Sequence, residues 1–459
     1  MKISRILISL LLIFLTISCF APSAWAFCGF YVAKADSKLY NKASQVVIAR
    51  KDNRTVLTMA NDYQGDVKDF AMVVPVPVVL KEEQVKVAKP AIVERLDAFS
   101  APRLVEYFDD DPCSPVMYEA DSALPSAAAP RRVQQRAKKN ADLGVTVEAK
   151  FNVGEYDIVI LSAKESNGLS TWLRRNGYKM PRGTRRLLRP YIRQRMKFFV
   201  AKVNLEKFEE KGYKFLRPLQ ISYKSPKFML PIRLGMVNST SEQDLLVYIL
   251  SPQGQAEVTN YRTVKIPSNT NVPLFVKQEF DDFYKSMFQN AYVKEDKKVA
   301  FLEYAWDMSS CDPCSADPLN RQELKDAGVF WLDDPVNREP TPRGFRRRRI
   351  SNGVYITRLH VRYTRDKFPE DLMFQTTSNR ENFQGRYILQ HPFKGKLECQ
   401  AGKRYQRSLP RRFEKEARNL AKLTNWDIND IRQKMNINGQ KVSRWWQSFF
   451  NLIGLGFNS

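Results

Sequence analysis

The residues best suited to chemistry in this sequence are Cys311 and Cys314, which form a Cys-x-x-Cys motif. An apolar run over residues 299–306 precedes the motif and is typical of a strand, while residues 318–328 are typical of a short helix. A helix that begins just after such a motif can lower the pKa of a thiol. The motif is therefore consistent with a redox pair that exchanges thiols and disulfides.

The alternative is that both cysteines form structural disulfides, and the sequence favours this alternative. Asp312 lies between them, and its negative charge would oppose formation of a thiolate. The helix expected after the motif is short and polar, with Ser315 or Asp317 as its N-cap and Gly328 just past its end. No βαβ pattern surrounds the motif.

The first 26 residues have the composition of a secretory signal peptide. Lys2 and Arg5 are followed by the apolar residues 6–17 and by an Ala-x-Ala cleavage sequence at residues 24–26. Cleavage would leave five cysteines as disulfide candidates: Cys28, Cys113, Cys311, Cys314 and Cys399. Because five is odd, one thiol would stay free or pair with another chain, and the spacing does not reveal the pairing.

The most unusual overall property of the chain is its net charge of +25. Removing Lys2 and Arg5 with the signal peptide leaves 72 cations against 49 acidic residues, or +23. In an exported protein this charge favours an anionic lipid, an acidic polysaccharide or an acidic protein as partner, rather than a nucleic acid. No stretch of the mature chain is long and apolar enough to predict a transmembrane helix.

Two groups of cationic residues are candidates for binding an anion. The first is the run Arg346, Arg347, Arg348, Arg349. The second lies in residues 355–363, a strand pattern in which Arg358, His360 and Arg362 share one face. His360 could also serve as a general acid. The alternatives are a solvated loop for the first group and the polar face of a strand for the second, and the sequence favours both alternatives.

Motifs for catalysis or cofactor binding are not evident. The sequence contains no Gly-rich phosphate loop, no Gly-x-Ser-x-Gly and no His-Glu-x-x-His. Its two histidines, His360 and His391, lie far from Cys311 in the sequence, so a zinc site is not favoured. We therefore expect no cofactor and no metal and lean against an enzyme, although catalysis by carboxylates needs no such motif.

The elements that would position these residues indicate an α+β protein rich in mainly antiparallel sheet. Residues 45–50 and 55–60 predict a hairpin, and residues 70–77 predict a strand whose prolines require an edge position. Residues 59–77 are echoed by 236–252, and 111–114 by 312–315, which suggests two duplicated halves. The predicted division is a signal peptide (1–26), the first part of an N-terminal half (27–117), a disordered linker (118–142), the rest of that half (143–205), a second half (206–404) and a basic helical tail (405–459).

The tail is expected to contain three helices. Residues 413–423 predict the first, Thr424 or Asn425 would cap the second, and Gly439 would end it. A third helix from residue 441 would carry one apolar stripe: Trp445, Trp446, Phe449, Phe450, Ile453. This stripe either lies in a membrane interface or docks on the protein itself, and the sequence favours docking.

Several sequence motifs occur in order along the chain. They are the opening Cys28-Gly-Phe-Tyr, residues 156–161, 169–181, 188–191 and 199–203, the Cys311-Asp-Pro-Cys314 block with the helix after it, and residues 356–363. Together they resemble the bacterial domain-of-unknown-function 2330 family over about residues 27–400. The resemblance implies an exported protein and supplies no catalytic residue.

These observations predict an exported protein located in the periplasm, the envelope or the extracellular space of a bacterium. Its expected function is that of a non-enzymatic binding or structural module for an anionic partner or a membrane surface. The alternative is an extracytoplasmic thiol–disulfide redox protein that uses Cys311 and Cys314.

Overall fold

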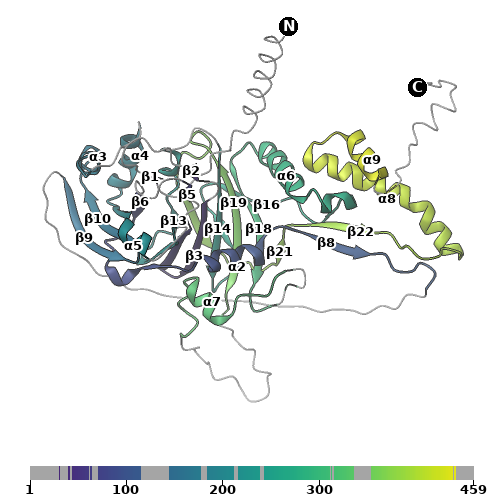
Figure 1. The fold of residues 1–459 in the computed structure, drawn as a ribbon, viewed down its shortest axis with the longest axis horizontal. Helices are drawn as coiled ribbons and strands as arrows, with labels where there is room; N and C mark the ends of the chain where they lie inside the picture. Colours follow the sequence, from purple (N-terminus) through teal and green to yellow (C-terminus); the bar gives the residue numbers. More distant parts are fainter. Residues whose placement is uncertain are drawn as a thin grey trace, which may run out of the picture.

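A computed structural model of the chain describes residues 30–31, 40–41, 44–60, 63–64, 71–114, 144–176, 183–210, 216–237, 242–310, 312, 315–334, 353–437 and 439–440. Two β-sheets pack face to face, and helices cover their outer faces (Figure 1). At one end of the long axis lie α3 (Ser166–Arg175) and α4 (Thr184–Arg193). Towards the other end lie α6 (Phe280–Lys294), α8 (Gln400–Thr424) and α9 (Ile428–Ile437).

The larger sheet has nine strands among the described residues, and most neighbours are antiparallel. Its order is β16 (Arg262–Lys265), β18 (Val299–Asp307), β19 (Tyr355–Tyr363), β14 (Gln243–Ser251), β3 (Ser44–Lys51), β4 (Arg54–Ala60), β12 (Leu219–Lys224), β7 (Val85–Val87), with β21 (Phe383–Gln384) beside β18. The pairs β3–β14 and β16–β18 are parallel.

The smaller of the two packed sheets has five antiparallel strands in the order β1 (Phe30–Tyr31), β6 (Ala71–Val76), β11 (Lys197–Val203), β10 (Tyr156–Ala163), β9 (Val145–Val153). In β6, Pro75 pairs with Phe198 of β11. On the other side, β1 reaches only Met72 and Val73. Pro75 therefore has a strand neighbour on one side only among the described residues, as its missing N–H requires.

The main hydrophobic core lies between these two sheets. Alternate residues of the large sheet, such as Val46, Val247 and Leu359, pack against residues of the small sheet such as Ile158 and Phe199. All five side chains are fully buried. Side chains of a strand point alternately to its two faces, so the other residues of the large sheet need a second cover.

Helices provide that cover. On the large sheet, α2 (Pro90–Ser100) and the segment around α7 (Arg321–Asp326) pack against the face opposite the main core. On the small sheet, Leu169 and Leu173 of α3 and Leu188 and Tyr191 of α4 cover the outer face. The group of α6, α8 and α9 forms its own core with β18 and the strands beside it.

Smaller elements complete the described fold. One three-stranded sheet has the order β13 (Met229–Leu230), β20 (Leu372–Thr376), β15 (Ala256–Val258), and another has β17 (Thr270–Asn271), β22 (Arg386–His391), β8 (Arg103–Phe108). The strands β2 (Tyr40–Asn41) and β5 (Tyr63–Gln64) form a pair, and α5 is Leu205–Glu210. Short 3₁₀ helices are Glu82–Gln84, Gly235–Val237 and Leu274–Lys277.

The predicted α+β class, with mainly antiparallel sheets and helices near the C-terminus, is confirmed. The predicted hairpin is β3 and β4, joined by a turn in which Asp52 has a φ of 53°. In β19 the predicted alternation also holds, because Leu359 and Val361 face the main core while Ile356 faces the helices.

Three predicted helix boundaries are wrong. The N-cap of α7 is Asn320 rather than Ser315 or Asp317, because its side chain accepts from the N–H groups of Gln322 and Glu323. The first turn of α9 is capped by Asp427, whose Oδ1 accepts from Asn429 N at 2.7 Å. Asn425 instead ends α8, with a φ of 62°. The helix α8 begins at Gln400, 13 residues before the predicted start, and contains Pro410.

The two predicted halves of the chain contribute to one sheet. Strands β3, β4 and β7 come from the first half, and β12, β14, β16, β18 and β19 come from the second. The echoed strands β6 and β14 lie in different sheets, and the duplication stays a prediction. The two shorter repeated segments, residues 111–114 and 312–315, have the same backbone hydrogen bond from their fourth residue to their first. Ser114 N donates to Asp111 O and Ser315 N donates to Asp312 O, both at 3.0 Å.

Several predictions lie outside the described residues. These are the signal peptide (1–26), the linker (118–142), the arginine run Arg346, Arg347, Arg348, Arg349, the cysteines Cys28, Cys311 and Cys314, and the tail stripe Trp445, Trp446, Phe449, Phe450, Ile453.

Candidate functional site

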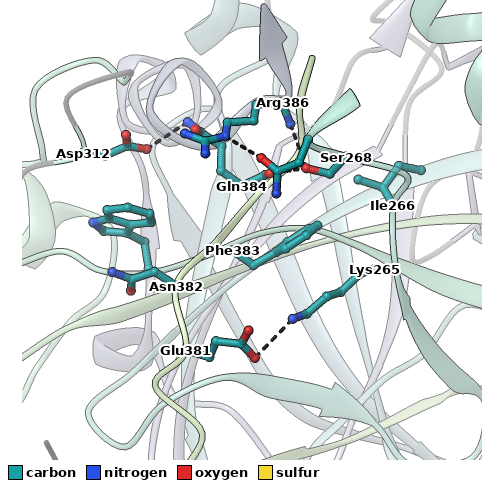
Figure 2. Close-up of a pocket in the computed structure, with 11 residues that line it drawn as sticks. Lys265, Ile266, Ser268, Asp312, Glu381, Asn382, Phe383, Gln384 and Arg386 are labelled. Carbon is teal, nitrogen blue, oxygen red and sulfur yellow. Dashed lines mark hydrogen bonds and ion pairs between the residues drawn. The ribbon is translucent and has the colours of Figure 1, made fainter. Parts of the chain in front are cut away.

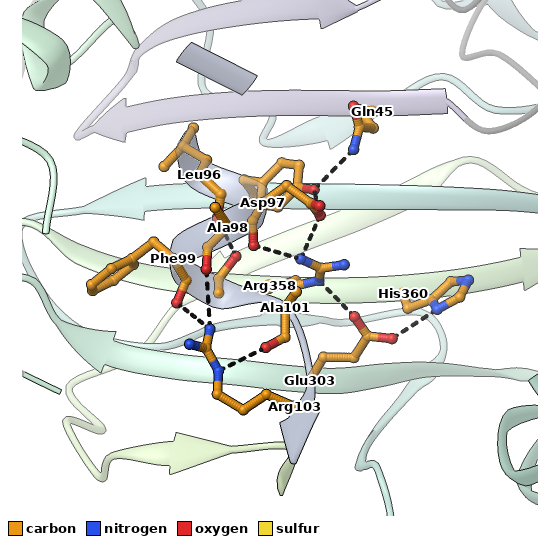
Figure 3. A network of polar contacts seen from close by, with 12 residues as sticks. Gln45, Leu96, Asp97, Ala98, Phe99, Ala101, Arg103, Glu303, Arg358 and His360 are labelled. Atoms are coloured by element: carbon orange, nitrogen blue, oxygen red, sulfur yellow. Dashed lines mark hydrogen bonds and ion pairs between the residues drawn. The ribbon is translucent and has the colours of Figure 1, made fainter. Parts of the chain in front are cut away.

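The predicted cationic face of β19 packs against α2 and α6, where its side chains form a network of largely buried charges, with Asp97 at one end 40% exposed. Figure 3 shows the part of this network that joins Asp97, Arg358, Glu303 and His360. Arg358, His360 and Arg362 all point to this side of the sheet, as alternation predicts. Each contacts carboxylates of the protein itself. We call the set Asp97, Asp244, Glu303, Arg358, His360 and Arg362 the buried charge network.

Glu303 stands at the centre of the network and is fully buried. The pairing of β18 with β19 shifts register between Leu302 and Tyr304, which marks a β-bulge at Glu303. A bulge inserts one extra residue and re-aims a side chain. As a result Tyr304 joins the helix-covered core, although Phe301 and Leu302 keep the usual alternation.

The carboxylate of Glu303 forms hydrogen bonds with three side chains. Arg358 Nε donates at 2.6 Å, His360 Nδ1 lies at 2.7 Å and the hydroxyl of Tyr284 donates to the same oxygen as His360. Tyr284 comes from α6, whose neighbouring Phe288 stacks on the imidazole with ring centroids 3.9 Å apart. Glu303 follows Phe301 on the helix-covered face of β18, where two cations of β19 and a helix converge on its carboxylate.

Two further carboxylates close the ends of the network. Asp244 of β14 lies 3.0 Å from His360 Nε2 and accepts two hydrogen bonds of 2.8 Å from Arg362. At the other end, Asp97 of α2 accepts from Arg358 Nη1 at 2.7 Å and from the hydroxyl of Tyr248 at 2.7 Å. Three carboxylates thus face two guanidinium groups and one imidazole.

These contacts lower the pKa of Glu303 and of Asp244 and raise the pKa of His360. Burial raises the pKa of Glu303, but attraction to His360 and Arg358 outweighs it and lowers that pKa to about 2. Burial also opposes ionisation of Asp244, yet its hydrogen bond to His360 and the nearby charges lower its pKa to about 2. For His360, burial disfavours the charged form, whereas attraction to Glu303 and the hydrogen bonds to Asp244 and Glu303 raise its pKa.

A doubly protonated His360 would donate one N–H to each carboxylate, because only the imidazolium has two donors. The network then carries three positive and three negative charges. Its cations are compensated within the protein, and His360 is 8% exposed. This geometry favours the polar face of a strand over a general acid or a site for an external anion.

We expect the stability contributed by His360 to depend on pH. Because the pKa of His360 is raised in the folded protein, its protonation stabilises the fold fully at pH values below the unfolded pKa of about 6.5. This contribution is lost as the pH rises through the pKa of the folded protein. The lowered pKa of Glu303 contributes above about 4.5 and is lost as pH falls towards about 2. The difference in unfolding free energy between wild type and His360→Gln should therefore be largest between about pH 4.5 and 6.5.

Urea unfolding of the two proteins across this pH range would test the expectation. If folding raises the pKa of His360 by 1, the free energy of unfolding at pH values below 6.5 rises by about 1.4 kcal/mol. His391→Gln is the matched control, because His391 has one partly exposed partner, Glu106 at 2.8 Å. A wild-type-to-variant difference that stays constant with pH would contradict a charged His360.

A second candidate site is the surface of α3 and α4, where all the arginines are exposed. We call this set the arginine layer: Arg174, Arg175, Arg185, Arg186, Arg189, Arg193, Arg195. No ion pair joins any of them to a carboxylate within the described part of the chain. Residues 166–205 contain no acidic residue at all. The layer is thus a patch of uncompensated positive charge.

The electrostatics of α4 are unfavourable for an isolated helix. Arg185, Arg189 and Arg193 follow one another at intervals of four, and like charges at this spacing repel. Arg185 and Arg186 also lie in the first turn, which has no acidic residue, although the positive end of the helix dipole disfavours cations there. An external anion would relieve both effects.

The cysteine pairing that the sequence left open is resolved in part. Cys113 and Cys399 form a disulfide across 286 residues of sequence. Cys399 is the N-cap of α8, and its sulfur accepts from Gly402 N at 3.1 Å. The bridge therefore fixes the start of α8 to the segment after β8.

The sequence analysis missed the acidic half of the buried charge network. Asp97, Asp244 and Glu303 lie far from β19 in sequence and were not candidates. The one signal was the position of Glu303 in the apolar run 299–306, since a charged residue inside a buried strand needs a partner. Most of the arginine layer lies in a dense basic stretch of the sequence, residues 182–197, but the sequence does not reveal that these side chains are exposed.

Comparisons with known proteins give one match. The sequence model of a family described as "Uncharacterized protein conserved in bacteria (DUF2330)" matches residues 22–375. Searches of curated proteins and of solved structures found no match. Within the described ranges, no helix is long and apolar enough to cross a membrane. The family description names no activity, so function has to be argued from the geometry.

Proposed function

Because the chain belongs to the bacterial DUF2330 family of uncharacterised proteins, we propose its function from the surface it presents: it is an exported module that attaches to an anionic membrane surface through the arginine layer. The observation that carries the proposal is the absence, within the described structure, of carboxylate partners for seven exposed arginines: six on two adjacent helices, and Arg195 just after α4. Export is supported by the Cys113–Cys399 disulfide, since disulfides persist in oxidising compartments.

Phospholipid headgroups suit the chemistry of the layer. Every member is an arginine, whose planar guanidinium binds phosphate in a bidentate manner. The same helices carry the half-buried apolar side chains Trp172, Leu187 and Ile192. Tryptophan is favoured at the level of the headgroups, and apolar contact distinguishes a lipid surface from a soluble acidic polysaccharide. These features support a membrane over the other anionic partners.

The test is binding to vesicles of phosphatidylglycerol and phosphatidylcholine. We expect wild type to sediment with these vesicles, and the variant Arg185→Gln, Arg186→Gln, Arg189→Gln, Arg193→Gln to lose most of this binding. Each basic residue near an anionic membrane is worth about 1 kcal/mol, so four should weaken binding by roughly a hundredfold or more. The variant should retain its melting temperature because all four side chains are exposed.

The matched control removes the same charge elsewhere. Lys403, Arg404, Arg407 and Arg411 are four exposed cations on α8, and their replacement by Gln should leave most of the binding intact. Equal loss in the two variants would mean that net charge, and not the arginine layer, causes the binding. Binding of wild type to soluble alginate but not to vesicles would replace the membrane by a polysaccharide.

Thiol–disulfide exchange at Cys311 and Cys314 stays a prediction of the sequence. Both cysteines lie outside the described residues.

A further inference from the structure

A pocket of about 570 Å³ opens beside β16, β18 and β21, on a part of the molecule that neither the buried charge network nor the arginine layer uses (Figure 2). Its size lies within the range of small-molecule binding sites. The described residues that line it combine charged, amide and aromatic side chains. We propose that this pocket binds a neutral saccharide.

The charges in the lining compensate one another. Two cations, Lys265 and Arg386, face two acids, Asp312 and Glu381. Lys265 Nζ and Glu381 Oε2 form an ion pair of 3.1 Å across the pocket, as Figure 2 shows. Arg386 Nε donates to Asn269 Oδ1 at 2.7 Å. A ligand with a net charge would therefore have to break an existing balance, whereas a neutral ligand would not.

The uncharged polar groups of the lining suit hydroxyl groups. Asn382 carries a carbonyl oxygen and an NH₂ group, so its side chain can accept and donate. Because Asn269 Oδ1 accepts from Arg386, Asn269 offers mainly its NH₂ group. Because Gln384 Nε2 donates to Asp312, Gln384 offers mainly its carbonyl oxygen. A sugar hydroxyl both accepts and donates, and adjacent hydroxyls present several such groups in a row. Asn382 is exposed at the pocket, and no hydrogen bond of its side chain is recorded within the described structure. It is the group most available to a ligand.

Two half-buried aromatic side chains provide the apolar complement. Phe383 lies in the middle of the pocket, between Gln384 and Lys265 (Figure 2). Trp306 donates its indole N–H to Ser310 O at 3.2 Å, so its polar edge is satisfied. Its ring stacks on Tyr304, with centroids 5.9 Å apart, and also lines the pocket. The C–H groups on the face of a sugar ring pack on such rings, because the ring face carries partial negative charge.

The inner wall of the pocket is rigid. Asp312 Oδ2 accepts from the hydroxyl of Tyr304 at 3.0 Å and from Gln384 Nε2 at 2.9 Å. Both Asp312 and Gln384 are buried, at 4% and 7% exposure. Ser268 donates to Gln384 O at 2.7 Å, which fixes the backbone of β21. A preorganised wall lowers the entropy that a ligand loses on binding.

The test uses calorimetric titration of the full chain with four neutral tetrasaccharides: maltotetraose, cellotetraose, mannotetraose and chitotetraose. We expect at least one to bind wild type. Asn382→Ala should weaken its binding about fivefold, the effect of one lost hydrogen bond. Asn152→Ala, an exposed asparagine on the distant strand β9, is the matched control and should bind as wild type does. Trp306→Leu should weaken binding more than tenfold.

Three results would overturn the proposal. They are no binding of wild type to any of the four sugars, equal affinities of Asn382→Ala and Asn152→Ala, and tighter binding of tetragalacturonate than of every neutral sugar. The melting temperature of Trp306→Leu separates loss of the pocket from loss of the fold, and Asn382→Ala keeps the test independent of that variant. Vesicle binding of Asn382→Ala should be unchanged, so this proposal and the membrane proposal fail separately.

Discussion

Replacing Glu303 by Gln is expected to lower the unfolding free energy by about 3 to 5 kcal/mol, the usual cost of removing one partner from a buried ion pair. The change keeps the shape of the side chain and removes its charge. Arg358 and His360 would then share two carboxylates in place of three, with Arg362 competing for Asp244. Little water reaches them, since Arg358 is only 5% exposed. The desolvation of these cations would therefore lack its main compensation.

The measurement is urea unfolding followed by circular dichroism at pH 6. Asp333→Asn is the matched control, because Asp333 also contacts two cations, Arg321 and Lys325, but does so at the surface. This control should change the unfolding midpoint little, as exposed ion pairs contribute little to stability. If Glu303→Gln unfolds at the same urea concentration as wild type, the network does not hold the sheet and helices together in the way its geometry indicates.

The second large effect is expected from the disulfide. Replacing Cys113 and Cys399 by Ser should lower the unfolding free energy by about 2 to 5 kcal/mol, because the bridge restricts a long loop of the unfolded chain. Besides the bridge, α8 is held to the segment after β8 by Asp109, which accepts from Arg412 Nη1 at 2.5 Å and from the hydroxyl of Tyr405. We therefore expect α8 to stay docked, but less stably.

Equilibrium unfolding of the double variant, compared with oxidised and with reduced wild type, would test the expected loss of stability. Reduction should lower the stability of wild type by more than that of the double variant, which lacks this bridge but keeps Cys28, Cys311 and Cys314. A peptide map of wild type should contain the Cys113–Cys399 cross-link. Equal stability of the oxidised wild type and the double variant would show that the bridge does not form or does not restrict the chain.

The sequence predicts local structure well where one rule decides it. The two apolar runs around residues 51–54 become the hairpin of β3 and β4, and the alternation of β19 separates its core side from its charged side. The misplaced start of α7 had a readable signal, since Asn320 and Glu323 form a capping box. The first half of α8 was missed; it contains Pro410, and the helix continues through this residue although proline disfavours a helix interior.

Features that depend on tertiary contacts could not be predicted from the sequence. The partners of β19 come from α2, β14 and β18, and the largest separation is 261 residues, between Asp97 and Arg358. The bulge beside Glu303 turns Tyr304 to the helix-covered face, and no periodic pattern reveals it. Exposure was equally hidden: Arg358 and the arginines of α4 look alike in sequence, yet Arg358 is buried among carboxylates and those of α4 face solvent.

The most direct test of the proposed function is the salt dependence of vesicle binding. Affinity for phosphatidylglycerol vesicles would be measured between about 0.05 and 0.5 M NaCl, over which the screening length falls severalfold. The account predicts a steep loss of wild-type affinity with salt, and both a lower affinity and a shallower slope for the α4 variant with four Arg→Gln changes. Wild-type binding that is independent of salt, or an unchanged slope in that variant, would contradict attachment through the arginine layer.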